Sequence, residues 1–245
     1  MKFHWMLNGS YSTSNILKTV VEGLGSNRYE SILLTFQLDQ NEPMVSAMFL
    51  TNNFPNQRFM IAVRPYTISS RHLSMIAKTF YDYFNNKLII NFVSGTYDNE
   101  YELFTNKTST REERKDELSG YIKSFVEDLK GTLYSDIAIS GASDKLISLC
   151  SEFSAINIAL IQDLDKLNKD NNIMLRVSIG IDVDKSQMTT DREFNNSICG
   201  TEDYIINKIK ELEAMGITDI LISNTYENIT EIDKTNALVD RYKSL

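Results

Sequence analysis

The chain has 245 residues, of which 42% are hydrophobic, and a formal net charge of -8 at pH 7. This length is typical of one large domain, so we expect a single domain over residues 1–245. An acidic chain without a basic stripe is not expected to bind nucleic acid. No stretch approaches the ~18 apolar residues of a membrane span, and the first residues do not resemble a signal peptide. Two cysteines, Cys150 and Cys199, do not make a disulfide framework, which favours a cytoplasmic protein.

Apolar strand patterns alternate with amphipathic helical patterns along the whole chain. The expected strands are Phe3–Leu7, Ser31–Phe36, Arg58–Val63, Leu88–Val93, Ile137–Ile139, Ala155–Leu160, Ile173–Ile181 and Asp219–Ser223. The expected helices are Ser14–Gly23, Pro43–Leu50, Ser70–Phe84, Thr110–Lys130, one starting near Ser143, Gln162–Lys169, Thr201–Met215 and Asn228–Tyr242. Eight alternations predict an α/β fold closed as a (β/α)8 TIM barrel, with an open doubly wound sheet as the alternative.

Small and polar residues follow two of the expected strands. Ser94 and Gly95 end one strand, and Ser140, Gly141, Ala142 and Ser143 lead from the next strand into a helix. Such a loop at a helix N-terminus exposes backbone N–H groups and the positive end of the helix dipole, which suits a phosphate. The alternative is that the serine before the helix is only an N-cap and the glycine only a turn residue.

The charged helix start near Thr110 places like charges four residues apart, as in Arg111 with Lys115. Such pairs disfavour an isolated helix. A phosphate bound near Arg114 or Lys115 would stabilise this segment, and an ordinary exposed face is the alternative.

Two arginines stand in apolar surroundings. Arg176 lies inside an expected strand, and Arg64 ends another strand just before Pro65. A buried cation must be paired or face a polar cavity, so both predict an anionic site in the barrel mouth, with a buried ion pair as the alternative. The two histidines, His4 and His72, belong to no recognisable metal motif, and no GxSxG motif is present.

Several of these segments together resemble the luciferase-like flavin-dependent monooxygenases, most closely their alkanesulfonate monooxygenase branch. The longest matching stretch is Ile61–Gly95, which contains Ala62-Val63-Arg64-Pro65 and ends in Asn91-Phe92-Val93-Ser94-Gly95. Glu113-Arg114, the Ser140–Ser143 loop and Cys199-Gly200-Thr201-Glu202 match further family segments in the same order. The chain looks like a shortened member of this family.

The resemblance implies a (β/α)8 barrel that binds FMN in its reduced form, supplied by a separate flavin reductase. It implies that O2 is used to oxidise a small organic substrate, with an anionic substrate as one option. It implies a homo-oligomer, such as a dimer, or a partner subunit. By position, it implies that Trp5, Asn91, Ser94, Gly95, Arg114, Ser140, Gly141, Ala142 and Ser143 bind the flavin. Arg176 matches an active-site arginine of the sulfonate branch, and Arg64 is expected to assist it with the substrate.

Four departures from the family pattern leave other functions open. The family's long insertion shrinks here to about Asp184–Ile198, its strand histidine is Ser178, its phosphate-contacting tyrosine is Lys115, and its cysteine has no counterpart in Thr35–Gln40. Flavin–oxygen chemistry must be shielded from water, and a short insertion provides little shielding. The alternatives are a non-catalytic flavin-binding or partner-binding barrel and a deazaflavin-dependent reductase.

Overall fold

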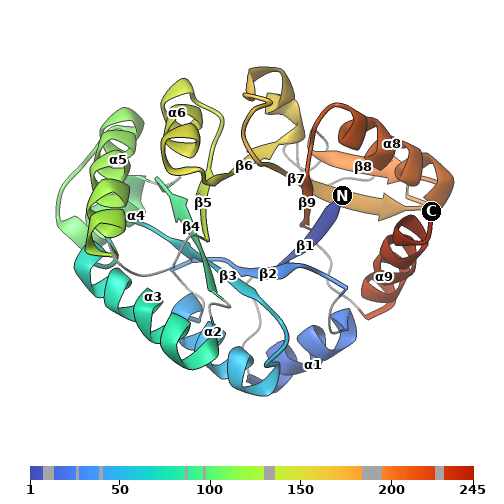
Figure 1. The fold of residues 1–245 in the computed structure, drawn as a ribbon, viewed down its shortest axis with the longest axis horizontal. Helices are drawn as coiled ribbons and strands as arrows, with labels where there is room; N and C mark the ends of the chain where they lie inside the picture. Colours follow the sequence, from blue (N-terminus) through green and yellow to red (C-terminus); the bar gives the residue numbers. More distant parts are fainter. Residues whose placement is uncertain are drawn as a thin grey trace.

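The computed structural model describes residues 1–7, 14–25, 28–38, 41–85, 88–95, 98–129, 136–183, 195–223 and 229–245. Parallel strands form a closed ring at the centre, and helices cover the outside of this ring (Figure 1). Residues 184–194, which include most of the predicted short insertion, lie outside the described ranges.

Eight parallel strands close the ring. They are β1 (Lys2–Leu7), β2 (Ser31–Leu34), β3 (Phe59–Val63), β4 (Leu88–Val93), β5 (Ile137–Ser140), β6 (Ile156–Leu160), β7 (Ile173–Ile181) and β9 (Asp219–Ile222). The strands from β1 to β6 pair in sequence order, β9 lies between β1 and β7, and pairing of β6 with β7 closes the barrel. The predicted (β/α)8 TIM barrel is confirmed. The alternative prediction of an open doubly wound sheet is wrong, because the strands of an open sheet do not close into a ring as β6 and β7 do here.

The helices outside the barrel match the predicted ones closely. They are α1 (Ser14–Leu24), α2 (Pro43–Asn53), α3 (Ser70–Phe84), α5 (Arg111–Asp128), α6 (Asp144–Phe153), α8 (Glu202–Ala214) and α9 (Ile229–Lys243). Among the described residues, no helix is long and apolar enough to cross a membrane.

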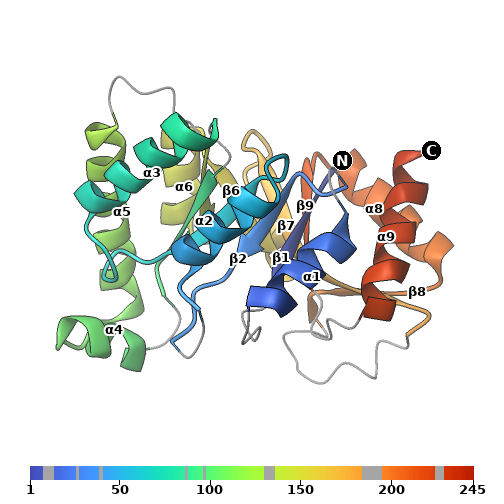
Figure 2. The same ribbon diagram turned by 90° about the horizontal axis from the view of Figure 1, so that it is seen from below.

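Three elements differ from the predictions. A helix, α4 (Asp98–Thr105), precedes α5, and a short strand, β8 (Ser197–Gly200), pairs only with the second half of β7. The predicted sixth helix is a short 3₁₀ helix over Ile161–Lys166. Figure 2 shows α4 beyond the barrel on the side away from the N-terminus.

Each barrel strand presents alternate residues to two different cores. The core inside the barrel is formed by Met6, Leu33, Met60, Ala62, Ile89, Ala138, Ile158, Met174 and Leu221. The larger core between barrel and helices contains the intervening residues, among them Trp5, Ile61 and Ile139. A residue two positions beyond an inner core residue therefore lies on the inner face, nearer the C-terminal end of the barrel.

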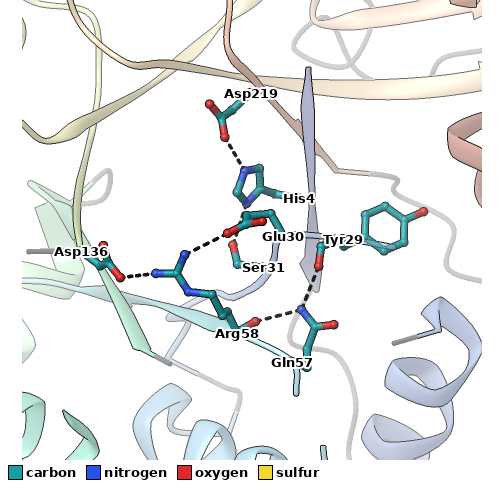
Figure 3. Close-up of polar contacts among 8 residues, drawn as sticks. All are labelled: His4, Tyr29, Glu30, Ser31, Gln57, Arg58, Asp136 and Asp219. Carbon is teal, nitrogen blue, oxygen red and sulfur yellow. Dashed lines mark hydrogen bonds and ion pairs between the residues drawn. The ribbon is translucent and has the colours of Figure 1, made fainter. Parts of the chain in front are cut away.

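A polar layer closes the opposite, N-terminal end of the barrel (Figure 3). His4 Nε2 lies 2.8 Å from Asp219 Oδ1, and His4 Nδ1 lies 2.7 Å from Ser31 Oγ. In the neutral imidazole, Nε2 donates to the carboxylate and Nδ1 accepts from the hydroxyl. Burial alone would raise the pKa of the Asp219 carboxyl, but hydrogen bonds from His4 and Thr218 lower it below its usual value.

These three side chains form a Ser–His–Asp arrangement, yet they are 0% (Ser31), 1% (His4) and 5% (Asp219) exposed. A nucleophile must be reachable by its substrate, so this arrangement has a structural role in joining β2, β1 and β9. Beside it, Arg58 donates to Glu30 at 3.0 Å and also to Asp136, which joins the starts of β2, β3 and β5.

Candidate functional site

A cavity of about 640 Å³ opens at the C-terminal ends of the barrel strands. Inner core residues such as Met6, Leu33 and Leu221 form its apolar floor. Polar residues that follow the strands form its walls. In parallel barrels this end is where ligands bind, because loops of different strands meet there.

Eight of the predicted site residues line this cavity. They are Arg64, Asn91, Ser94, Gly95, Ser140, Gly141, Ala142 and Arg176. Strand alternation explains four of them, since Arg64, Asn91, Ser140 and Arg176 each lie two positions beyond an inner core residue.

Three predicted residues are not among those lining the cavity. Trp5 is fully buried in the core between barrel and helices, where its ring packs edge-on against Tyr29 with centroids 5.4 Å apart. It lies on the outer face because the inner face of β1 carries the neighbouring Met6. Arg114 is buried on α5, and its Nη1 donates to the carbonyl of Ser109 at 2.9 Å. The structure therefore does not bring either side chain to the cavity.

The third is Ser143, which sits at the N-cap position of α6. Its backbone is extended as an N-cap requires, but its side chain makes no capping hydrogen bond. Among the described residues, nothing hydrogen-bonds its buried Oγ. The first turn of α6 thus has no side-chain cap, and the carboxylate of Asp144 lies in this turn. Backbone N–H groups at such a helix end are the kind of donors that an anion can use.

The Ser140–Ser143 loop is held in place by hydrogen bonds to β6. The Gly141 N–H donates to the carbonyl of Ile158 at 2.8 Å, so this N–H is not available to a ligand. The Gly141 carbonyl accepts a 2.7 Å bond from the Asn157 side chain. Gly141 has φ +138, and a Cβ there would lie 2.4 Å from Leu146 Cδ1, so this position requires glycine.

Asn91 and Ser140 are neighbours on the inner face of β4 and β5. The Ser140 hydroxyl donates to Asn91 Oδ1 at 2.9 Å. Because the carbonyl oxygen of Asn91 is used here, its amide group is the part that can donate to a ligand.

Arg64 and Glu100 form a buried ion pair in another wall of the cavity. The Tyr66 hydroxyl donates to Glu100 Oε1 at 2.7 Å. Burial raises the pKa of Tyr66, and the charges of Arg64 and Arg114 oppose that effect. Gly95 makes room for this tyrosine, since a Cβ at its φ of +87 would lie 2.4 Å from the Tyr66 hydroxyl. Arg64 thus forms the buried ion pair that was the alternative prediction from the sequence, and it also lines the cavity.

Arg176 is half-buried on β7 and lies in the cavity lining with Arg111 and Asp163. Asp163 also accepts from Lys166 Nζ at 2.7 Å. The cavity lining therefore contains both cationic and anionic side chains.

The start of α5 is stabilised without a phosphate. The Thr110 side chain accepts from the Glu113 N–H at 3.2 Å, and the Glu113 side chain accepts from the Thr110 N–H at 2.7 Å, which is a capping box. Lys115 Nζ pairs with Glu112 at 2.5 Å. The like charges are thus compensated locally, and the phosphate expected near Arg114 or Lys115 is not needed for this role.

Several residues in the cavity lining were not predicted from the sequence, notably Phe36, Leu38, Glu100 and Arg111. No helix was expected over Asp98–Thr105 from the sequence, so Glu100 was not predicted to lie in the site.

No protein-family model and no curated protein matches the sequence. Solved structures do match the fold. EDTA monooxygenase from Chelativorans sp. BNC1 has a TM-score of 0.78 at 10% identity, over 100% of this chain and 93% of that chain. An F420-dependent secondary alcohol dehydrogenase in complex with an F420-acetone adduct has a TM-score of 0.78 at 11% identity, over 98% of each chain. Riboflavin lyase with modified FMN and riboflavin has a TM-score of 0.79 at 7% identity, over 100% of this chain and 91% of that chain. At these identities the comparison establishes one point, that this chain has the same barrel fold as these proteins.

Proposed function

We propose that this chain is a flavin-dependent oxidoreductase, specifically a monooxygenase that uses reduced FMN and O2 on a small organic substrate. The observation that carries the proposal is the N-terminus of α6, which has no side-chain cap and directly follows Ser140, Gly141 and Ala142 of the cavity lining. The barrel that this chain shares with a monooxygenase and with a riboflavin lyase holding FMN supports the same function.

The residues present fit an FMN molecule. The loop would hold the phosphate through backbone N–H groups at the start of α6, where no side chain caps the helix. The Asn91 amide and the backbone near Ser94 and Gly95 would face the flavin ring, above an apolar floor. When bound, the flavin supplies the redox chemistry. The chain's own residues bind and orient it, and Arg176 would orient the polar end of the substrate.

The proposal is tested by titrating the purified protein with reduced FMN under anaerobic conditions and following flavin fluorescence. We expect a dissociation constant of about tens of micromolar or tighter, ~-6 kcal/mol or better. Ser140→Asp places a negative charge beside the loop and should weaken binding about tenfold or more. Absence of binding, or unchanged binding in Ser140→Asp, would contradict the proposal.

A deazaflavin-dependent reductase is the second candidate, favoured by the equally similar barrel of the F420-dependent alcohol dehydrogenase. A parallel titration with coenzyme F420 separates the two, since the tighter ligand identifies the cofactor. A barrel that binds a flavin but turns over no substrate is the remaining alternative.

We also propose a partner for α2. This helix contains no charged residue, and Val45 (65%), Met48 (46%) and Phe49 (37%) are exposed although they are apolar. A helix that is apolar on its outer face as well is normally covered. A second copy of the chain is the expected partner, and Met48→Glu should convert a dimer into a monomer in light scattering. A separate flavin reductase would supply the reduced cofactor.

A further inference from the structure

One wall of the cavity carries opposite charges that cancel. This wall, which we call the Arg64–Glu100 wall, consists of Phe36 and Leu38 after β2, Arg64 after β3 and Glu100 on α4. The side chains of Arg64 and Glu100 are only 9% and 3% exposed. A charged pair that is removed from water to this degree is costly to separate, because either partner alone would be a buried uncompensated charge.

The carboxylate of Glu100 is fixed at both oxygens. Oε2 is in the ion pair with Arg64 Nη1, and Oε1 accepts the Tyr66 hydroxyl. The tyrosine is itself packed edge-on against Tyr101, with ring centroids 5.0 Å apart. Glu100 is therefore a built-in counter-ion for Arg64 and not a side chain that turns away when a ligand enters.

The rest of the wall is aromatic and apolar. The guanidinium carbon of Arg64 lies 5.1 Å from the centroid of the Phe36 ring. The Phe36 ring in turn contacts Phe104 of α4, with centroids 6.1 Å apart. The exposed faces of such a wall favour contact with a ring or an alkyl group, because burial of apolar surface there requires no charge to be desolvated.

We infer that the Arg64–Glu100 wall selects the uncharged, aromatic or alkyl part of the substrate, and that Glu100 determines this preference by neutralising Arg64. This inference rests on the proposed function and corrects the expectation that Arg64 binds an anion. An anion could pair with Arg64 only by displacing a buried carboxylate. Without Glu100, the same arginine would attract an anion strongly.

The test uses the FMN-loaded full chain and two probes of matched shape, 4-fluorobenzamide and 4-fluorobenzoate, each titrated by 19F NMR. We expect the wild type to bind the amide more tightly than the acid. Glu100→Gln should shift the ratio of the two affinities about tenfold or more toward the acid, since a charge-assisted contact to Arg64 becomes available. Tyr66→Phe is the matched control, because it removes the other contact to Glu100 without a change of charge, and its ratio should stay at the wild-type value.

A wild type that prefers the acid or binds neither probe, or a Glu100→Gln protein that keeps the wild-type ratio, would overturn the inference. If Glu100→Gln does not fold, the double variant Arg64→Gln/Glu100→Gln takes its place. The wall of this double variant carries no charge, so the protein should still bind the amide more tightly than the acid. A ratio of affinities shifted toward the acid would overturn the inference. Failure of the proposed function is seen separately, as loss of FMN binding. The same probes then test the wall on the cofactor-free chain.

Discussion

The Asn157 side chain should determine how well the chain distinguishes FMN from riboflavin. Asn157 is fully buried on β6, on the face toward the helices, and its amide donates to the Gly141 carbonyl at 2.7 Å and to the Ile139 carbonyl at 3.4 Å. Among the described residues, none donates to its Oδ1. An unpaired buried acceptor lowers the free energy of unfolding by about 1–3 kcal/mol. The presence of Asn157 is therefore not explained by stability alone. Its hydrogen bond to Gly141 does, however, position the loop that would hold the phosphate.

Replacement of Asn157 by leucine, which has the same number of side-chain heavy atoms and the same branching, removes the 2.7 Å hydrogen bond to Gly141 and the unpaired acceptor. Loss of the bond costs about 0.5–1.5 kcal/mol, and removal of the unpaired oxygen offsets this, so the free energy of unfolding should change by less than about 1.5 kcal/mol. The loop, however, loses the hydrogen bond from Asn157 of β6 to the Gly141 carbonyl, while the bond from the Gly141 N–H to the Ile158 carbonyl remains. If one or two hydrogen bonds to the phosphate are lost, at about 1.5–3 kcal/mol each, FMN affinity should fall about tenfold to a hundredfold.

The assay compares dissociation constants for FMN and for riboflavin, which lacks the phosphate, together with urea unfolding curves. Asn157→Leu should weaken FMN selectively and leave riboflavin binding within about twofold. Asn236→Leu is the matched control, because Asn236 is also buried and hydrogen-bonded, to Tyr29 and Gly23, away from the loop. Equal losses for both flavins, or no loss in Asn157→Leu, would refute the role of the loop.

Three other variants test separate parts of the structure. Gly95→Ala places a Cβ at a φ of +87, where it meets the Tyr66 hydroxyl. This variant should lower the free energy of unfolding, measured by urea titration, by about 1–3 kcal/mol. An unchanged free energy of unfolding would show that the loop relaxes. Because the pKa of Asp219 is lowered, its ionised form stabilises the fold above about pH 4, and this contribution disappears at lower pH. The unfolding curves of wild type and Asp219→Asn should therefore converge in acid, and a constant difference would contradict the network with His4. Ser31 is fully buried, so a fluorophosphonate should not label it in the folded protein. If the wild type is labelled and Ser31→Ala is not, Ser31 is an accessible nucleophile and its structural role is refuted.

The barrel could be predicted because its signal is local. Each apolar strand such as Ile173–Ile181 is followed by a helical pattern, and eight repeats of this order close a barrel. The inner-face residues Ser140 and Arg176 were predicted for the same reason, since each ends or interrupts an apolar strand with a polar side chain. Asn91 was implied by the family resemblance.

What the sequence did not reveal depends on contacts between distant segments. The pairing of Arg64 with Glu100 joins the end of β3 to α4, and nothing in either segment specifies the partner. The orientation of Trp5 depended on which face of β1 turns inward, and Met6 in the inner core decides this. The Ser31–His4–Asp219 layer joins residues from the two ends of the chain and becomes visible only when the barrel closes.

The central claim is that the cavity at the C-terminal ends of the strands binds FMN with its phosphate at the start of α6. A crystal structure of the chain soaked with FMN tests this most directly. We predict electron density for the phosphate beside the Ser140–Ser143 loop, within hydrogen-bonding distance of the backbone N–H groups at the start of α6. A phosphate bound at Arg114 on α5, or a flavin outside the cavity, would contradict the account.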